Sequence, residues 1–270
     1  MAEEKLSAWD KMLIVRDVKR PNAKDYIDNI FTDFYEMHGD RYFGDDGAII
    51  GGIARLDGRP VTIIAELKGH NIEDNKKCNF AMPHPEGYRK ALRLAKQAEK
   101  FHRPCICFID TPGAYPGVDA EKRGQGEAIA RNLFEFMRLR TNIISVVLGE
   151  GGSGGALALG VCDALGMLQN SLYSVISPRG AASILWKDAG KEKEACNIMK
   201  ITADDLYDFG ICDEVIEEPA GGAQNDVYKT SENIKDFLSK KISENLKKDI
   251  DEMLDLRYNK FRKIGVYKES

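Results

Sequence analysis

The sequence lacks any apolar run that approaches the roughly 20 residues needed to cross a bilayer. It is also poor in histidine, with four residues and none after His102. No charge of one sign dominates, because 39 Lys and Arg residues stand against 43 Asp and Glu residues, for a net charge of −4. We therefore expect no membrane span, and the overall charge gives no indication of nucleic-acid binding.

Paired cysteine motifs are missing as well. Six cysteines are present, but none forms a C-x-x-C pair, and Cys105 and Cys107 alternate as small residues on one face of a predicted strand. This spacing does not favour a disulfide framework or a zinc site. The first five residues are polar and acidic, with no apolar segment after them. We expect no signal peptide, a soluble cytoplasmic protein and no metal bound by this chain.

Strand patterns and helix patterns alternate along most of the 270 residues, of which 43% are apolar. Asp57-Gly58 is typical of a two-residue hairpin turn. Ser7 and Asp10 have the spacing of a capping box, and Asn22 is predicted to cap a second helix. Strands are predicted at 48–56, 61–67, 105–109, 143–148, 165–168, 173–176 and 214–216. Helices are predicted at 6–16, 22–38, 86–101, 126–138, 156–161, 180–186, 191–199 and 202–208. The alternation predicts an α/β fold, a sheet with helices on its faces.

Three further segments carry predictions. Residues 68–85 form a long polar loop, and loops of that length are usually functional or mobile. Residues 231–262 follow one amphipathic pattern that would make a helix of about 45 Å. We expect that helix to pack on a partner or to wrap its own subunit. The helix at 86–101 bears a basic stripe, for which a solvated surface is favoured over a phosphate site.

Glycine is concentrated at one predicted strand-to-helix junction. Five of the seven residues from Gly149 to Gly155 are glycine, between the strand at 143–148 and the helix at 156–161. A second glycine-containing loop, at 110–117, follows another strand. Ligands of α/β proteins gather at the carboxyl ends of strands, and helix N-termini present unpaired N–H groups. We therefore predict a backbone oxyanion hole, over the alternative that the glycines merely permit tight turns.

Other glycine-rich motifs explain this junction less well. The stretch matches G-x-G-x-x-G, but it does not lie at a first βα turn, and no acidic residue follows at the expected spacing. Ser153 lies within G-x-S-x-G, yet a nucleophile elbow needs a later histidine and none follows His102. His70 and His84 lie in the polar loop and receive no role. The site offers backbone dipoles without an obvious side-chain base.

Several long motifs resemble the α subunit of bacterial acetyl-CoA carboxylase carboxyltransferase. They include MPHPEGYRKALRL at 82–94, FIDTPGAYPGV at 108–118 and GEGGSGGALALG at 149–160. The resemblance covers about residues 6–225. It implies a crotonase-like ββα superhelix with flanking N- and C-terminal helices. The implied division is a helical arm at 1–45, a carboxyltransferase core at 46–225 and a helical extension at 226–270.

The resemblance also implies an activity and its partners. The family transfers a carboxyl group from carboxybiotin, held on a biotin carboxyl carrier protein, to acetyl-CoA. The product is malonyl-CoA, in the first committed step of fatty acid synthesis. Activity requires a β subunit, in an α2β2 arrangement, and the β subunit carries the zinc. Biotin carboxylase is a further implied partner, and the implied ATP binding belongs to the whole complex and not to this chain.

The resemblance assigns the site as well. The N–H groups of Gly154 and Gly155 would stabilise negative charge on the biotin ureido oxygen. The freed ureido nitrogen can then take the acetyl proton, so no side-chain base is needed. The implied biotin pocket comprises Gly113, Ala114, Gly151, Gly152 and Ala156. Positions 68–71 and Arg179 depart from the family pattern and receive no role.

Three alternatives remain at this point. One is a stand-alone crotonase-type enoyl-CoA hydratase or isomerase, which would need carboxylates at its site. Asp110, Glu127 and Glu150 are the nearby candidates. Another is a carboxyltransferase that acts on a different acyl-CoA. The third is a non-catalytic scaffold whose C-terminal helix recruits a partner.

Overall fold

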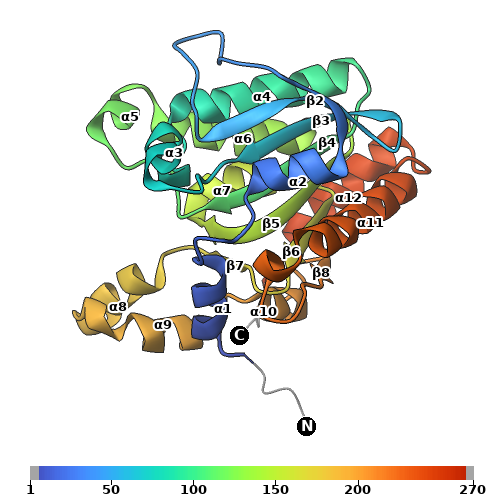
Figure 1. The fold of residues 1–270 in the computed structure, drawn as a ribbon. Helices are drawn as coiled ribbons and strands as arrows, with labels where there is room; N and C mark the ends of the chain where they lie inside the picture. The colour runs from blue at the N-terminus through green and yellow to red at the C-terminus, as the bar shows by residue number, and fades with distance from the viewer. Residues whose placement is uncertain (1–5, 266–270) are drawn as a thin grey trace, which may run out of the picture.

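The computed structural model describes residues 6–265, and a mixed sheet runs through its centre (Figure 1). The strand order is β1-β2-β3-β4-β5-β6-β8, and β7 pairs with the end of β5. Strands β1 to β3 are antiparallel, and the pairs from β3 onward are parallel. The strands are β1 Thr32–Glu36, β2 Ile49–Leu56, β3 Arg59–Glu66, β4 Cys105–Thr111, β5 Ile143–Gly152, β6 Ala164–Leu168, β7 Leu172–Ser174 and β8 Glu214–Ile216.

Helices cover both faces of this sheet, as Figure 1 shows, and a lobe of α8 and α9 projects from one end. The α-helices are α1 Ala8–Val15, α2 Ala23–Ile30, α3 Ile72–Lys77, α4 Pro85–Lys100, α5 Val118–Lys122, α6 Gln125–Arg138, α7 Ser153–Gly160, α8 Pro178–Trp186, α9 Glu192–Ile198, α10 Ala203–Asp208, α11 Val227–Asn245 and α12 Ile250–Arg262. Short 3₁₀ turns are η1 Asn79–Ala81, η2 Ala189–Lys191 and η3 Ala223–Asn225.

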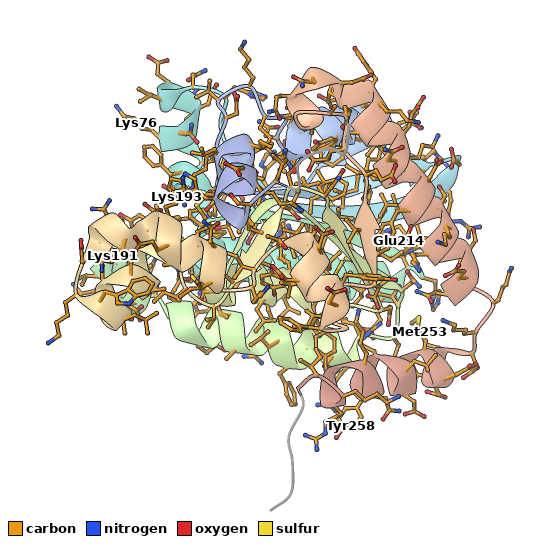
Figure 2. All side chains as sticks on the ribbon, turned by 90° about the horizontal axis from the view of Figure 1, so that it is seen from below. Lys76, Lys191, Lys193, Glu214, Met253 and Tyr258 are labelled. Carbon is orange, nitrogen blue, oxygen red and sulfur yellow. The ribbon has the colours of Figure 1, made fainter. Side chains whose placement is uncertain are left out.

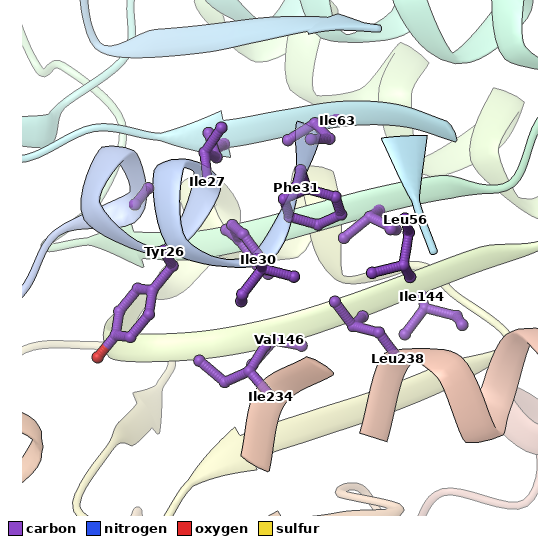
Figure 3. Close-up of a cluster of buried hydrophobic side chains, with 14 of the residues drawn as sticks. Tyr26, Ile27, Ile30, Phe31, Leu56, Ile63, Ile144, Val146, Ile234 and Leu238 are labelled. Atoms are coloured by element: carbon purple, nitrogen blue, oxygen red, sulfur yellow. The ribbon is translucent and has the colours of Figure 1, made fainter. Parts of the chain in front are cut away.

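The sheet separates two halves of the hydrophobic core. On one face, helices α2 and α11 bury Ile27 and Leu238 against strand residues such as Ile63 and Ile144 (Figure 3). On the other face, α4, α6 and α7 contribute a second cluster that includes Phe136. Burial of apolar surface on both faces is typical of parallel strands and explains why β4 and β5 are almost wholly apolar. The predicted α/β class is confirmed.

Local signals in the sequence were accurate at turns and caps. Asp57 and Gly58 have φ of 49° and 78°, the left-handed pair that a type I′ hairpin requires. Ser7 and Asn22 each cap a helix with a reciprocal capping box. These signals depend on neighbouring residues alone, which is why the sequence was sufficient to predict them.

The second predicted helix was wrong beyond residue 30. Helix α2 ends at Ile30, and β1 follows at once to pair with β2 at the edge of the sheet. The apolar spacing of Phe31 and Phe34 suits a helix as well as a strand. Pairing with β2 decided between them, because it supplies backbone hydrogen bonds to a segment rich in aromatic residues.

The single C-terminal helix was also wrong. The segment forms two helices, α11 and α12, and Asp249 caps the second one by accepting the N–H of Asp251. Helix α12 turns back onto the protein, with Met253 pointing toward the body and Tyr258 away from it (Figure 2). The buried guanidinium of Arg257 donates to the carbonyls of Phe136, Leu139 and Thr141. We expected this segment either to pack on a partner or to wrap its own subunit, and these contacts agree with the second expectation.

The polar loop and the basic stripe also differ from expectation. The segment at 68–85 contains α3 and η1, capped by Asn71. The stripe consists of Arg89, Arg93, Lys96 and Lys100. Arg89 bonds Asp40 at 2.8 Å, Arg93 donates to the Gly39 carbonyl at 3.0 Å, and Lys96 contacts Glu135 at 3.1 Å. Lys100 is exposed beside the ring of Phe101. Three of the four stripe residues therefore tie α4 to neighbouring segments of the same chain.

Across residues 6–265, no helix combines the length and the apolar character needed to cross a membrane. The six cysteines are buried and carry free thiols. In the same range, no three His, Cys, Asp or Glu side chains come close enough together to hold a metal ion.

Candidate active site

The glycine-rich junction is a strand end joined directly to a helix. Strand β5 continues to Gly152, and α7 begins at Ser153, three residues earlier than predicted. The strand is longer because Gly151 and Gly152 pair with Tyr173 and Ser174 of β7, a partner that sequence does not reveal. Ser153 has φ of 50°, a left-handed conformation that costs a non-glycine residue about 1–2 kcal/mol. The chain therefore makes a strained elbow between strand and helix.

The two glycine-containing loops lie against each other, as expected. A Cβ placed on Gly152 would lie 2.3 Å from the Pro112 carbonyl oxygen. A Cβ on Gly155 would lie 2.7 Å from the Ala114 nitrogen and 2.8 Å from the Gly113 carbonyl carbon. Contacts below 3.0 Å with backbone cannot be relieved by side-chain movement, so both positions require glycine. Gly154 differs, since its nearest outside atom would be a methyl of Ile129 at 3.5 Å.

The first turn of α7 presents unpaired donors. No side chain caps this helix, and the N–H groups of Gly154 and Gly155 donate to no acceptor among the described residues. The first N–H groups of any helix lack intrahelical partners, and the helix dipole adds positive potential there. This end of α7 can therefore stabilise a negatively charged oxygen.

An apolar groove of about 470 Å³ adjoins the first of these donors, at Gly154. Its walls include Ser153, Gly154, Leu157, Tyr173, Val175, Leu206, Ile211 and Phe261. A second groove of about 500 Å³ shares Tyr173 and Val175 with it and continues over α8 and α10. Val175, Ile184 and Phe209 are 82%, 71% and 58% exposed. Contiguous exposed apolar surface of this kind marks a site of ligand or protein contact.

The remaining predicted pocket residues have different surroundings. Gly113 adopts φ of 145°, and its N–H donates to the Thr111 hydroxyl at 3.0 Å. Ala114 packs against a small cluster that contains Tyr88. Gly151 is buried and paired within the sheet, and the side chain of Ala156 is buried in the core. Gly113, Gly152, Gly154 and Gly155 therefore come together, whereas Ala156 contributes packing.

The three candidate carboxylates of a hydratase do not gather in this groove. Asp110 is 3% exposed and lies 3.3 Å from Lys68 Nζ. Glu150 makes a two-point ion pair with Arg16, at 3.0 and 2.9 Å. Glu127 pairs with Arg131 on the exposed side of α6. Each carboxylate therefore already has a partner of its own.

The loop histidines have structural partners. His70 Nε2 lies 3.0 Å from a carboxylate oxygen of Asp25. The ring of His84 stacks on Tyr115 with centroids 4.2 Å apart, and its backbone N–H donates to Asp46. Arg179 lies exposed at the start of α8. The structure therefore gives the two histidines contacts that hold loops in place.

Sequence reasoning missed two buried polar groups, Glu66 and Arg20, and considered Asp110 only as a carboxylate of a hydratase. Glu66 ends β3 and is fully buried, Asp110 lies near the end of β4, and Arg20 bonds Glu218. One signal was available, because Glu66 and Asp110 close strands that are otherwise apolar. Burial of a carboxyl group is costly without a reason, so such residues at strand ends indicate a functional region.

Glu66 gives a prediction about stability and pH. Complete burial, and secondarily the Asp110 charge, raise the pKa of Glu66 well above its usual range. The unfolded chain releases this proton near about pH 4.3, and the native chain holds it to a higher pH. In that window the native state binds more protons, so the free energy of unfolding falls as pH rises. Glu66→Gln keeps the shape of the side chain but removes the group that titrates. We expect greater stability than the native chain at neutral and alkaline pH, and a flatter pH dependence.

Thermal unfolding measured from about pH 5 to pH 9 checks this result. Glu232→Gln, at an exposed position on α11, is the control and should leave the pH dependence unchanged. Parallel curves for Glu66→Gln and the native chain would show that Glu66 titrates normally.

Solved structures with the same architecture define the class of this fold. A transcarboxylase 12S chain aligns with a TM-score of 0.63 and 22% identity, over 81% of this chain and 44% of that one. A chain of a Pseudomonas malonate decarboxylase hetero-dimer aligns with a TM-score of 0.64 and 16% identity, over 75% and 83%. These matches show that the chain has the crotonase-like α/β fold of those two chains.

Comparison of sequences narrows this class to one family. Residues 2–265 match the family model described as acetyl co-enzyme A carboxylase carboxyltransferase-like. The acetyl-coenzyme A carboxylase carboxyl transferase subunit alpha of Clostridium acetobutylicum is 57% identical over 267 residues, which cover 99% of this chain and 97% of that protein. The Bacillus cereus protein of the same name is 60% identical, over 96% and 80%. The chain belongs to the family of acetyl-CoA carboxylase carboxyltransferase α subunits.

A fused relative adds information about assembly. A Clostridium tetani protein named acetyl-coenzyme A carboxylase carboxyl transferase subunits beta/alpha is 58% identical over 266 residues. The match covers 98% of this chain but 46% of that protein, so the chain spans about half of the fused relative. In that relative, the α-like segment is covalently joined to a β subunit.

Proposed function

We propose that this chain is the α half of a carboxyltransferase that moves a carboxyl group from carboxybiotin to acetyl-CoA and so forms malonyl-CoA. The observation that carries the proposal is the pair of unpaired N–H groups of Gly154 and Gly155, the first of which lines an apolar groove. Family membership supplies the reaction, and the junction supplies a physical means of lowering its barrier.

The elbow has the chemistry that such a reaction requires. When bound, carboxybiotin supplies the carboxyl group, and negative charge develops on its ureido oxygen. The N–H groups of Gly154 and Gly155 would donate to that oxygen, and the apolar walls of the groove would exclude water and strengthen the interaction. Gly113 and Gly152 keep the two loops in contact, so the donors are already oriented. Loss of one such donor typically raises a barrier by about 3 kcal/mol.

The second substrate site belongs to a partner. We propose a β subunit seated over β7, α8 and α10, where the two apolar grooves meet. Support comes from the exposed Val175, Ile184 and Phe209 and from the fused β/alpha relative. The biotin would arrive on a carrier protein loaded by biotin carboxylase, and zinc would reside in the β subunit of an α2β2 assembly. Residues 46–225 would carry the chemistry, flanked by the arm at 1–45 and the extension at 226–270.

An activity assay tests this proposal. The chain is purified alone and together with a β subunit, and malonyl-CoA-dependent carboxylation of free biotin is measured. We expect activity in the mixture and none from the single chain, because one half of the site is then missing. Hydration of an enoyl-CoA by the single chain would favour the hydratase, and no activity in either sample would favour a scaffold. The acyl preference is measured in the opposite direction, with carboxybiotin as the carboxyl donor and acetyl-CoA or propionyl-CoA as the acceptor.

A further inference from the structure

The register of the parallel sheet shifts just before the elbow. Ile109 of β4 faces Val147 of β5, but Thr111 faces Gly151, so Asp110 alone lies opposite residues 148–150. We call residues 148–150 the β5 bulge. Extra residues on one strand leave backbone groups without ladder partners and re-aim the chain that follows. Here the chain that follows is the elbow itself.

Side chains from distant segments satisfy the bulge. Asp110 Oδ1 accepts the Glu150 N–H at 3.0 Å, and Lys68 Nζ lies 3.3 Å from the same oxygen. The Arg20 guanidinium donates to the Leu148 carbonyl at 2.6 Å. Arg20 is itself held by two hydrogen bonds to Glu218, at 2.8 and 2.9 Å. The bulge is therefore held by a carboxylate at the Glu150 N–H and by a guanidinium at the Leu148 carbonyl.

The fit around Asp110 is close. A Cβ on Gly149 would lie 2.5 Å from Asp110 Oδ1, so only glycine lets the bulge approach the carboxylate. The N–H of Asp110 donates to Glu66 Oε2 at 3.1 Å, which locates the Asp110 backbone. Asp110 and Arg20 are 3% and 6% exposed. Neither residue lines either of the two apolar grooves.

We propose that Asp110 and Arg20 are positioning residues that hold the β5 bulge and thereby aim the N–H groups of Gly154 and Gly155. A strand advances about 3.3 Å per residue, so loss of the two-residue shift would displace the elbow by about 7 Å along the sheet. Even a displacement of about 1 Å can cost 10²-fold in rate. This inference rests on the proposed transfer reaction at the elbow.

Asp110→Asn in the complex with the β subunit tests the proposal. The amide keeps the shape but loses the charge that holds Lys68 and strengthens the Glu150 contact. We expect kcat for biotin carboxylation to fall by about 10- to 100-fold, with KM for malonyl-CoA within about twofold. An Asp110→Asn complex with kcat within twofold of the native complex would overturn the proposal. Inactivity of the native complex would instead remove the proposed function.

Asp163→Asn is a matched control at the opposite ends of the strands. Asp163 also accepts a strand N–H, that of Ile143 at 2.7 Å, and also pairs with a basic residue, Arg257. Neither of these partners lines the two apolar grooves. We expect a comparable change in melting temperature and unchanged kcat. An equal fall in kcat for Asp163→Asn would show that the effect of Asp110 is merely structural and would overturn the proposal.

A milder variant covers the case in which Asp110→Asn does not assemble. Lys68 is partly exposed, and Lys68→Gln removes its contact with Asp110 while leaving the buried carboxylate in place. We expect a smaller fall in kcat, again with little change in KM. If the Asp110→Asn complex does not assemble, unchanged kcat for Lys68→Gln would overturn the proposed role of Asp110.

Discussion

Gly155→Val abolishes carboxyl transfer while the complex with the β subunit still forms: this is the largest change in activity that we expect. A Cβ at this position meets the Ala114 nitrogen at 2.7 Å and the Gly113 carbonyl carbon at 2.8 Å, so the two loops must separate. Separation turns the N–H groups of the first turn of α7 away from a shared oxygen. Loss of an oxyanion donor costs about 10²- to 10³-fold in kcat.

Steady-state carboxylation of biotin, with co-purification of the two subunits, provides the measurement. Gly126→Ala is the matched control, because Gly126 lies in the first turn of α6 with no atom within 4 Å of a new Cβ. Alanine there should leave kcat unchanged and stabilise the helix by up to about 1 kcal/mol. Near-normal turnover by Gly155→Val would remove the oxyanion assignment. The smaller Gly155→Ala serves if the valine variant does not fold.

Arg257→Ala should produce the largest loss of stability. Its guanidinium is 1% exposed, donates to three carbonyls and forms a two-point pair with Asp163 at 2.7 and 2.8 Å. Truncation leaves the carbonyls without a donor and Asp163 buried without a counter-charge. Breaking a buried pair in this way typically costs about 3–5 kcal/mol. For a protein of this size, the melting temperature should fall by about 6–20 °C.

Thermal unfolding of Arg257→Ala and Arg140→Ala, side by side, separates burial from charge. Arg140 pairs with Asp251 of α12, the helix that also carries Arg257, but the side chains of Arg140 and Asp251 are 49% and 73% exposed. An exposed pair contributes at most about 1 kcal/mol, so Arg140→Ala should unfold close to the native chain. Equal effects of the two substitutions would mean that α12 is held by charge alone and that the buried network contributes little.

The sequence predicted elements correctly where local chemistry decides them. The alternating apolar runs of β4 and β5, the Asp57-Gly58 turn and the caps at Ser7 and Asn22 all depend on residues close in the chain. It predicted wrongly where a distant partner decides. Phe31 and Phe34 fit a helix or a strand, and only β2 resolved the ambiguity. The C-terminal pattern suits one helix or two, and Arg257 holds α12 against the protein through carbonyls more than a hundred residues away.

The candidate site divides in the same way. That the glycines at 113, 152, 154 and 155 serve one place could be inferred from the chain, because both loops follow strands of a parallel sheet. That the β5 bulge exists could not, since a register shift is a relation between strands and leaves no local pattern. The groups that hold it, Arg20, Asp110 and Glu218, come from three distant segments.

The sequence by itself determined two features of the site. Glycine stands where two backbone segments must touch, and α7 begins without a side chain that caps its N–H groups. Only the tertiary structure decided that β5 runs on to Gly152 and that buried side chains orient the donors of α7. The reason is physical. A glycine permits close approach without specifying what approaches, and the direction of an N–H group depends on every contact that holds its backbone in place.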